Sequence, residues 1–240
     1  MGRPARIDRA AIAAAASEIG LDDLTLRAVA DHLGVSITGL YHHIEDKDDL
    51  MRLAAEHVAT RSTVPEDRGQ HWAVWLFEWA VHSRDGFLAE PGLIGQYLEG
   101  AISAEVVADK FDTALGVLVR QGFTVREAQA AFELVSSLVV GSALRTIQER
   151  RAAEAGRAVA AGHRLVLADA GSGDLEHLRL LLADRSPRAP FTAHLTTALV
   201  GIAAERGDDV ATVTEHLRGA AQPASRRRRT RTATTSRSRT

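Results

Sequence analysis

The chain has 240 residues, a formal net charge of −2 and no cysteine. This length suffices for one sizeable core and a small satellite domain, and the lack of cysteine excludes disulfides and thiolate metal sites. Alanine and leucine dominate, aromatic residues make up 5% of the chain, and no run alternates between apolar and polar residues as a strand does. We therefore expect an all-α protein.

The N-terminus carries a short basic arm ahead of the first expected helix. Arg3 and Arg6 lie in this arm, which is suited to following a DNA backbone or entering a minor groove. Asp8 is a typical N-cap for the helix that follows. The alanine run 13–16 is too short to cross a bilayer, and no signal-peptide pattern precedes it. These features favour a cytoplasmic protein without a membrane partner.

Residues 25–47 predict a helix, a tight turn, a second helix and the start of a third. Gly34 ends the first of these helices, because glycine readily takes the left-handed conformation. Thr25, Ser36 and Asp46 are expected to cap the three helices. Leu40 and Ile44, four residues apart, hold the second helix to the body. Its other face is left free and carries Ile37, Thr38, Tyr41 and His42.

A short helix with small polar and aromatic residues outward is typical of a helix that enters the DNA major groove. Two short helices joined at a glycine also occur in helical proteins that never bind nucleic acid, so the pattern alone leaves both readings open. The combination of motifs resembles the TetR family of bacterial transcriptional repressors. The matching stretches are Leu24–Ala30, Leu33–Ser36, Leu40–Ile44, Lys47 and Leu50.

Side-chain chemistry suggests a role for most of the expected DNA contacts, which are Arg3, Arg6, Thr25, Arg27, Ser36, Ile37, Thr38, Tyr41, His42 and Lys47. Arg27 suits a bidentate bond to guanine, and Ile37 can pack on a thymine methyl group. Thr38 can meet a base edge or a phosphate, and Lys47 can meet a phosphate beside the free amides of its helix. The resemblance implies that Tyr41 and His42 contact phosphates. His43 is interpreted as a packing residue, and Gly39 as the loss of a contact that relatives make with a larger side chain.

The charge of this segment limits its nonspecific affinity. Residues 1–62 contain seven Lys or Arg against ten Asp or Glu. Because a basic surface is the usual footprint of nucleic-acid binding, contacts must come from a few placed cations. We expect modest nonspecific affinity from these residues alone.

A long helix is expected from Arg68 to Ala89, and all three tryptophans share one of its faces. Such a stripe is either plain core or one wall of an apolar ligand pocket, and the sequence does not decide between them. If a pocket exists, its expected lining is Trp72, Trp75, Trp79, His82, Tyr97, Phe111, Phe132 and Ser136.

Further helices are expected at 104–121, 125–151 and 191–206. The second is apolar nearly all round and so must be covered all round, which favours a second subunit as the cover. The family joins two copies through a four-helix bundle, and the positions expected to serve it in the last helix are Leu195, Leu199, Ile202 and Ala203.

A second, weaker resemblance points to the tetracycline-repressor branch of the family. It rests on Gly122–Glu127 and Val140–Leu144. That branch holds a magnesium–drug chelate with histidines, where this chain offers Arg61-Ser62-Thr63 and Gln96-Tyr97. A different, fairly hydrophobic ligand is therefore expected.

The expected domains are a helix-turn-helix domain (1–46), a connecting helix (47–62), a ligand-binding and dimerisation domain (63–210) and a basic tail (211–240). Residues 152–174 are rich in alanine and glycine and are interpreted as a linker. From Gln222 onward the tail has seven arginines and no acid, so it is either a solvated terminus or an added source of DNA attraction.

The sequence thus favours a homodimeric repressor that binds a palindromic operator in double-stranded DNA and leaves it when a small hydrophobic effector binds. The family implies that the effector shifts the connecting helix and so changes the spacing of the two reading helices. The alternative is a dimeric DNA-binding regulator without an inducer. The sequence has no Gly-x-Ser-x-Gly nucleophile elbow, no phosphate-binding loop and no His-Glu-x-x-His zinc-binding helix. We therefore expect neither an enzyme with catalytic residues nor a metal or other cofactor.

Overall fold

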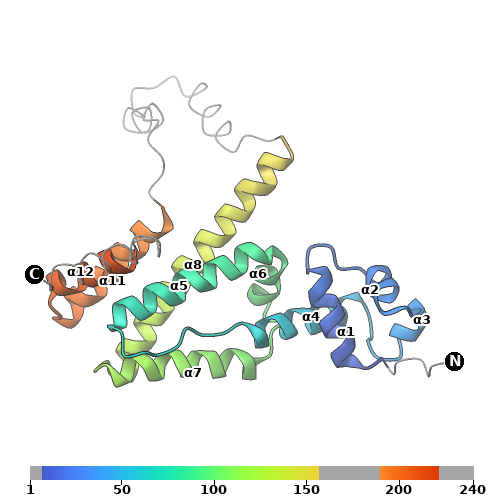
Figure 1. The fold of residues 1–240 in the computed structure, drawn as a ribbon, viewed down its shortest axis with the longest axis horizontal. Helices are drawn as coiled ribbons and strands as arrows, with labels where there is room; N and C mark the ends of the chain where they lie inside the picture. Colours follow the sequence, from blue (N-terminus) through green and yellow to red (C-terminus); the bar gives the residue numbers. More distant parts are fainter. Residues whose placement is uncertain (1–6, 157–189, 222–240) are drawn as a thin grey trace, which may run out of the picture. The chain divides into compact units, whose positions relative to one another are not determined.

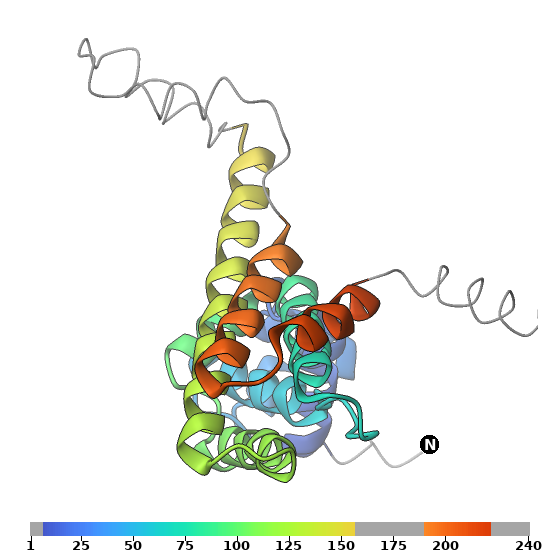
Figure 2. The same ribbon diagram turned by 90° about the vertical axis from the view of Figure 1, so that its left-hand side faces the viewer.

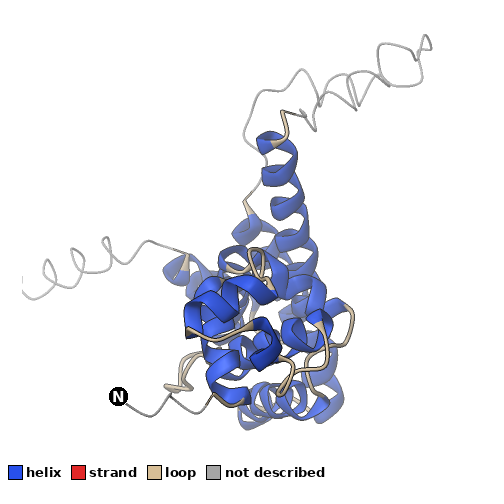
Figure 3. Ribbon diagram, turned by 90° about the vertical axis from the view of Figure 1, so that its right-hand side faces the viewer, coloured by secondary structure: helices blue, strands red, loops and turns tan. Residues whose placement is uncertain are grey.

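The computed structural model describes residues 7–156 and 190–221, and every regular element within these ranges is a helix (Figures 1 and 3). The predicted all-α fold is confirmed. In chain order the helices are α1 (Arg9–Ile19), α2 (Leu26–Leu33), α3 (Ile37–Leu40), α4 (Lys47–Arg61), α5 (Trp72–Ala89), α6 (Pro91–Leu98), α7 (Ala104–Arg120), α8 (Val125–Glu154), α11 (Phe191–Arg206) and α12 (Val210–Ala220).

The helix starts near the N-terminus are fixed by side chains that accept backbone amides. Asp8 and Thr25 accept the amide three residues further on at 2.8 and 3.0 Å. Ser36 and Asp46 do the same at 3.1 and 2.8 Å. Gly34 takes a left-handed conformation with φ of 67° at the end of α2. These predicted boundaries are confirmed, because capping signals act over only a few residues.

The described residues form two compact units, each built from several stretches of the chain. One comprises residues 7–61, 84–103 and 140–156 with Pro190, and the other comprises residues 62–83, 104–139 and 191–221. Because the division falls within α5 and within α8, each of these helices contributes to both units.

In the first unit, α1, α2 and α3 form a head that packs against α4 (Figure 1). Apolar side chains from all four helices meet in its core. The fully buried members are Ile12, Ala16, Val29, Leu40 and Leu50. Since α3 has only four residues, it depends on this packing and on its cap rather than on its own helix propensity.

The second unit is organised around the start of α5. Trp75 is fully buried there, and its indole N–H donates to the carbonyl of Pro65 at 3.0 Å. Leu118 from α7 and Leu195 from α11 are fully buried in the same unit. Helices α11 and α12 pack against each other as a hairpin (Figure 2).

One helix start differs from the sequence prediction, and one helix was not predicted. Helix α5 ends at Ala89 as expected, but Pro91 then begins a further helix, α6; proline suits a first helical position because its φ is preset and its missing N–H is not needed there. Helix α5 begins at Trp72 rather than at Arg68, because Gly69 has a φ of 73° that a helix cannot include.

The C-terminal expectations need a correction as well. Residues 211–220 were assigned to the tail, but they belong to α12, whose Val213 and Leu217 are 1% exposed. Helix α8 continues to Glu154 and so includes the first residues of the expected linker. The basic tail from Gln222, most of that linker, and Arg3 and Arg6 lie outside the described residues.

Helix α8 has 30 residues and, by length and composition alone, is apolar enough to cross a membrane. A core helix passes the same test. Along α8 the side chains of Val135, Val139, Ala143 and Ile147 are at most 3% exposed, which is the periodic burial of a core helix.

Candidate nucleic-acid interface and ligand site

Helix α3 has one face that is anchored and one that is open. Ser36 caps the helix and Leu40 is fully buried beneath it. The predicted reading residues are all exposed: Ile37 (41%) and Thr38 lie in the helix, Tyr41 (50%) is its C-cap residue, and His42 follows in the turn. The open face is therefore available to a groove of DNA.

Two cations flank this open face in sequence and are accessible. The side chain of Arg27 on α2 is 84% exposed and lies 3.8 Å from the carboxylate of Asp31. Because an exposed ion pair of this kind contributes little, Arg27 can exchange Asp31 for a base edge. Lys47 is exposed at the first position of α4, directly after its cap Asp46.

Gly39 and His43 are the two remaining residues of interest near α3. A Cβ atom on Gly39 would meet only the Ser36 hydroxyl at 3.4 Å and the Val35 Cβ at 3.9 Å, so packing does not demand a glycine there. His43 is half-buried, and its carbonyl accepts a guanidinium N–H from Arg9 at 2.6 Å. The hydrogen bond uses the main chain of His43, so the packing role of its side chain stays a prediction.

Three of the predicted ligand-lining residues gather in an aromatic cluster within the second unit. The ring of Phe132 on α8 lies 4.4 Å from that of Trp79 on α5 and 5.3 Å from that of Phe111 on α7. Trp79 and Phe111 are half-buried. Ser136, one turn along α8, donates its hydroxyl to the carbonyl of Phe132 at 2.7 Å. We call Trp79, Phe111 and Phe132 the aromatic cluster.

The other predicted lining residues are placed elsewhere. Trp75 is engaged with Pro65 in the core, and the indole N–H of Trp72 donates to Asp208 at 3.1 Å. His82 is exposed. Tyr97 belongs to the other unit, where its ring lies 5.8 Å from that of Phe87. The indole N–H groups of Trp72 and Trp75 are thus bonded within the protein, so the structure groups only Trp79 of the three tryptophans with Phe111 and Phe132.

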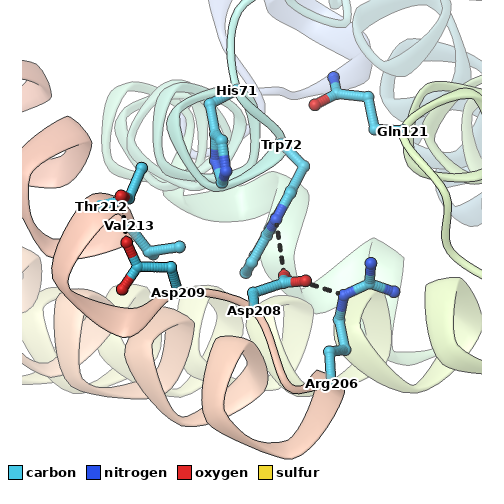
Figure 4. A pocket seen from close by; sticks show the side chains of 8 residues that line it. All are labelled: His71, Trp72, Gln121, Arg206, Asp208, Asp209, Thr212 and Val213. Carbon is cyan, nitrogen blue, oxygen red and sulfur yellow. Dashed lines mark hydrogen bonds and ion pairs between the residues drawn. The ribbon is translucent and has the colours of Figure 1, made fainter.

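A pocket of about 270 Å³ opens where the start of α5 meets the hairpin of α11 and α12 (Figure 4). Of the residues that line this pocket, only Trp72 was predicted from the sequence. The others were missed; apart from His71, they lie far from Trp72 along the chain. The lining residues are His71, Trp72, Gln121, Arg206, Asp208, Asp209, Thr212 and Val213.

The charges of this pocket are largely satisfied by one another. The carboxylate of Asp208 accepts both the Trp72 indole and the Arg206 guanidinium, each at 3.1 Å (Figure 4). Arg206 also lies 3.4 Å from Glu127 and 3.4 Å above the centre of the Phe123 ring. The pocket is therefore a structural junction with an internal ion-pair network rather than an open charged site.

His71 caps α5 at the edge of the same pocket. Its Nδ1 accepts the amide of Ala73 at 3.2 Å, and its ring stacks on that of His216 at 4.7 Å. Burial lowers the pKa of His71 below 6.5, the nearby His216 and Arg206 lower it further, and Asp208 opposes them. Both the geometry and this pKa favour the neutral imidazole. Among the described residues, no group of three or more His, Asp or Glu is placed to hold a metal ion.

The positions of α11 expected to face a second subunit are buried within the chain itself. Leu195, Leu199 and Ala203 are fully buried, and Ile202 is 8% exposed, so that assignment is wrong. Small exposed residues recur on α11 and on the part of α8 in the same unit, although His194 and Glu205 of α11 are exposed as well. With Leu134 of α8, these positions comprise Ala130, Leu134, Ser137, Ala193, Thr197, Gly201 and Ala204; we call them the small-residue faces.

Residues 9–54 match the profile of the bacterial regulatory proteins of the tetR family. The tetracycline repressor protein class G of Vibrio anguillarum is 31% identical over 153 residues, which cover 58% of this chain and 69% of that protein. The chain belongs to the TetR family. Against several other curated relatives, the matched stretch spans only 56% of their length.

Solved TetR-family structures share the fold. TetR from Acinetobacter baumannii is 27% identical, covers 84% of this chain and 99% of its own, and superposes with a TM-score of 0.57. ActR from Streptomyces coelicolor, solved in complex with actinorhodin, is 22% identical, covers 85% and 100%, and gives a TM-score of 0.62. The relatives include DNA-binding transcriptional repressors, and some structures contain ligands. TetR-family regulators are in general not enzymes.

Proposed function

We propose that this TetR-family chain is a cytoplasmic, sequence-specific repressor that binds a palindromic operator as a homodimer. The observation that carries the proposal is the anchored and open α3: Leu40 is fully buried, while Ile37 at the start of the helix and Tyr41 at its C-cap are 41% and 50% exposed. A helix fixed from behind and exposed in front can enter a major groove without rearrangement.

The reading residues divide into base contacts and phosphate contacts. Arg27 bonds to guanine and Ile37 packs on a thymine methyl group, with Thr38 at a neighbouring base edge or phosphate. Tyr41, His42 and Lys47 contact phosphates and so set the register of the head without carrying sequence information. The arm with Arg3 and Arg6 follows the backbone or the minor groove.

The homodimer forms through the small-residue faces of α8 and α11. Small side chains let the helices of two subunits approach closely, and Leu134, which is 46% exposed, supplies the largest apolar contact. A closed two-fold dimer presents two copies of α3 to two half-sites, which matches a palindromic operator.

The effector that releases the operator is a small hydrophobic molecule held at the aromatic cluster. Rings from three helices converge there, and Ser136 adds a polar group, as in most apolar ligand sites. Two related structures contain minocycline and actinorhodin. A magnesium–tetracycline chelate fits this chain poorly, because Ser62, Thr63 and Gln96 lack the imidazole that the resemblance requires. The Ser62 carbonyl instead accepts the ammonium group of Lys110 from α7.

The experiment that tests this function is selection of bound DNA from a random pool by the full-length chain. We expect enrichment of an inverted repeat whose half-sites lie about 10 base pairs apart or a multiple of that distance, so that both heads reach the same face. Enrichment of single, unpaired sites would contradict the dimer, and absence of any enrichment would overturn sequence-specific binding.

A further inference from the structure

The loop between α1 and α2 is a contact point for the helices that follow the head. Leu21 in this loop is 3% exposed. It is covered by the start of α6, and its backbone N–H donates to the carboxylate of Glu90 at 3.4 Å. Asp22, the next residue, pairs with Arg151 near the end of α8 at 3.0 Å. All of these residues belong to the first compact unit.

Gly92 is the tightest point of this contact. A Cβ atom on Gly92 would lie 2.7 Å from the Leu21 Cβ, 3.2 Å from its carbonyl carbon and 3.4 Å from the Asp22 amide nitrogen. The first distance is shorter than a packed interior tolerates, and the atoms concerned are main chain or next to it. The backbone of α6 therefore rests directly on the backbone of the loop. Gly95, one turn along the same helix, has nothing within 4 Å of its Cβ position.

Glu90 connects the same two segments through its polar group. It occupies the N-cap position of α6, but its side chain makes no capping hydrogen bond. Its carboxylate reaches the Leu21 amide instead. Glu90 therefore binds the loop of the head instead of capping its own helix. This is consistent with a contact that positions the loop.

We infer that Gly92 is a positioning residue, and that the α6–loop contact is a second joint that sets the orientation of the reading head. This inference rests on the proposed operator-binding function. The first joint is α4, which continues the chain from the head and packs on α6. The head already packs on α4 through α1, and the contact at Leu21 adds a second, direct link between the head and α6.

The joint acts on DNA through the short path from Leu21 to α2. Thr25, four residues later, is the N-cap of α2, and Arg27 lies in the first turn of that helix. Helix α3 packs on α2, so a displaced loop carries both reading elements with it. A shift of α6 therefore reaches the head through the loop as well as through α4. In a dimer the shift occurs twice and changes the separation of the two reading helices.

The test compares Gly92→Ala with Gly95→Ala in the full-length chain. Both changes replace a helical glycine by alanine and gain similar helix propensity, so they differ mainly in the contact with Leu21. Affinity is measured for an isolated half-site and for inverted repeats whose spacer is shortened or lengthened by one base pair, and thermal unfolding is recorded for each variant.

We expect Gly92→Ala to bind the half-site like wild type but to lose about tenfold on the operator with native spacing, with its optimum moved to another spacer. Gly95→Ala should retain the wild-type optimum. Equal losses of Gly92→Ala on half-site and operator, with a lowered melting temperature, would show a purely structural glycine and overturn the joint. Unchanged binding by Gly92→Ala would also overturn it. If wild type binds no selected DNA, the proposed function itself fails, and the joint fails with it.

Discussion

Arg9 on α1 and Asp49 on α4 form a two-pronged ion pair, with Nη1–Oδ2 and Nη2–Oδ1 distances of 3.0 and 2.9 Å. The Asp49 side chain is only 4% exposed. It also accepts the amide of Glu45 at 3.1 Å and the guanidinium of Arg52 at 2.6 Å. The first helix of the head is thus tied to the helix that leads out of it by one fully bonded carboxylate.

This carboxylate makes the stability of the head sensitive to acid. The hydrogen bond from Arg9 lowers the pKa of Asp49 from 3.8 to about 2, against the opposing effect of burial. Because the folded pKa lies below the unfolded one, the stabilisation is complete above about pH 4 and is lost as the pH falls toward 2. A shift of this size corresponds to about 2 kcal/mol.

We expect Asp49→Asn to lower the free energy of unfolding at neutral pH by about 2 kcal/mol and to flatten its acid dependence. Urea unfolding at neutral pH and near pH 3 measures both effects. Asp48→Asn is the matched control, because Asp48 is an exposed carboxylate in the same first turn. Similar losses for the two variants would contradict the role given to the buried ion pair.

Substitution of Arg27 and substitution of Lys47 are expected to weaken DNA binding in different ways. Arg27→Ala should cost about 1–3 kcal/mol on the cognate operator and relax the preference at one base position. Lys47→Ala should weaken all sequences alike and reduce the salt dependence of binding by about one unit of slope. Titrations on cognate and scrambled DNA at several salt concentrations separate the two. Equal loss on both sequences for Arg27→Ala would remove Arg27 from the readout.

We expect the fluorescence of only one of the three tryptophans, Trp79, to change when a ligand binds. Trp72 and Trp75 are held by Asp208 and Pro65 in the interior, whereas Trp79 is half-buried in the aromatic cluster. We expect hydrophobic ligands to quench the fluorescence of Trp79, so that Trp79→Phe abolishes the response. Trp72→Phe should preserve the response. Quenching that survives Trp79→Phe would place the ligand elsewhere.

The small-residue faces predict the dimer interface. Leu134→Glu introduces a charge where Leu134 is 46% exposed at the centre of the α8 face, and a buried unpaired charge is costly. We expect monomers in sedimentation experiments and loss of binding to the palindrome. Val210→Glu is the control, because Val210 is a 36% exposed apolar residue outside these faces. A dimer that tolerates Leu134→Glu would require a different interface.

The head was predictable because its determinants are local. Each cap acts on an amide three residues away, and Gly34 needs only its own left-handed conformation to end α2. The exposure of Ile37 and Tyr41 likewise follows from where Leu40 must point. Periodicity and capping therefore predicted both the elements and the open face of α3.

The aromatic stripe shows where local signals fail. Trp72, Trp75 and Trp79 share one helical face by spacing, yet Trp72 bonds to Asp208, which lies 136 residues away in the sequence. Trp75 bonds to Pro65. Tertiary packing decides whether a tryptophan is hydrogen-bonded in the core or available to line a ligand site. The spacing of the tryptophans along the helix does not encode this packing.

The α11 assignment failed for a related physical reason. Apolar spacing shows that Leu195 and Leu199 must be covered, but it does not show whether the cover is the same chain or a second one. The structure buries both within one chain. Small residues such as Gly201 carry almost no hydropathy signal, although they mark the face that two helices can share.

The division of α3 into an anchored and an open side bears on how such a regulator acquires new targets. Ser36 and Leu40 keep the helix in place, while Ile37, Thr38 and Tyr41 project beyond the fold. Substitutions on the projecting side change the chemistry offered to DNA but leave the buried Leu40 and the Ser36 cap in place. Operator preference can therefore drift during evolution while the thermodynamic robustness of the scaffold is preserved.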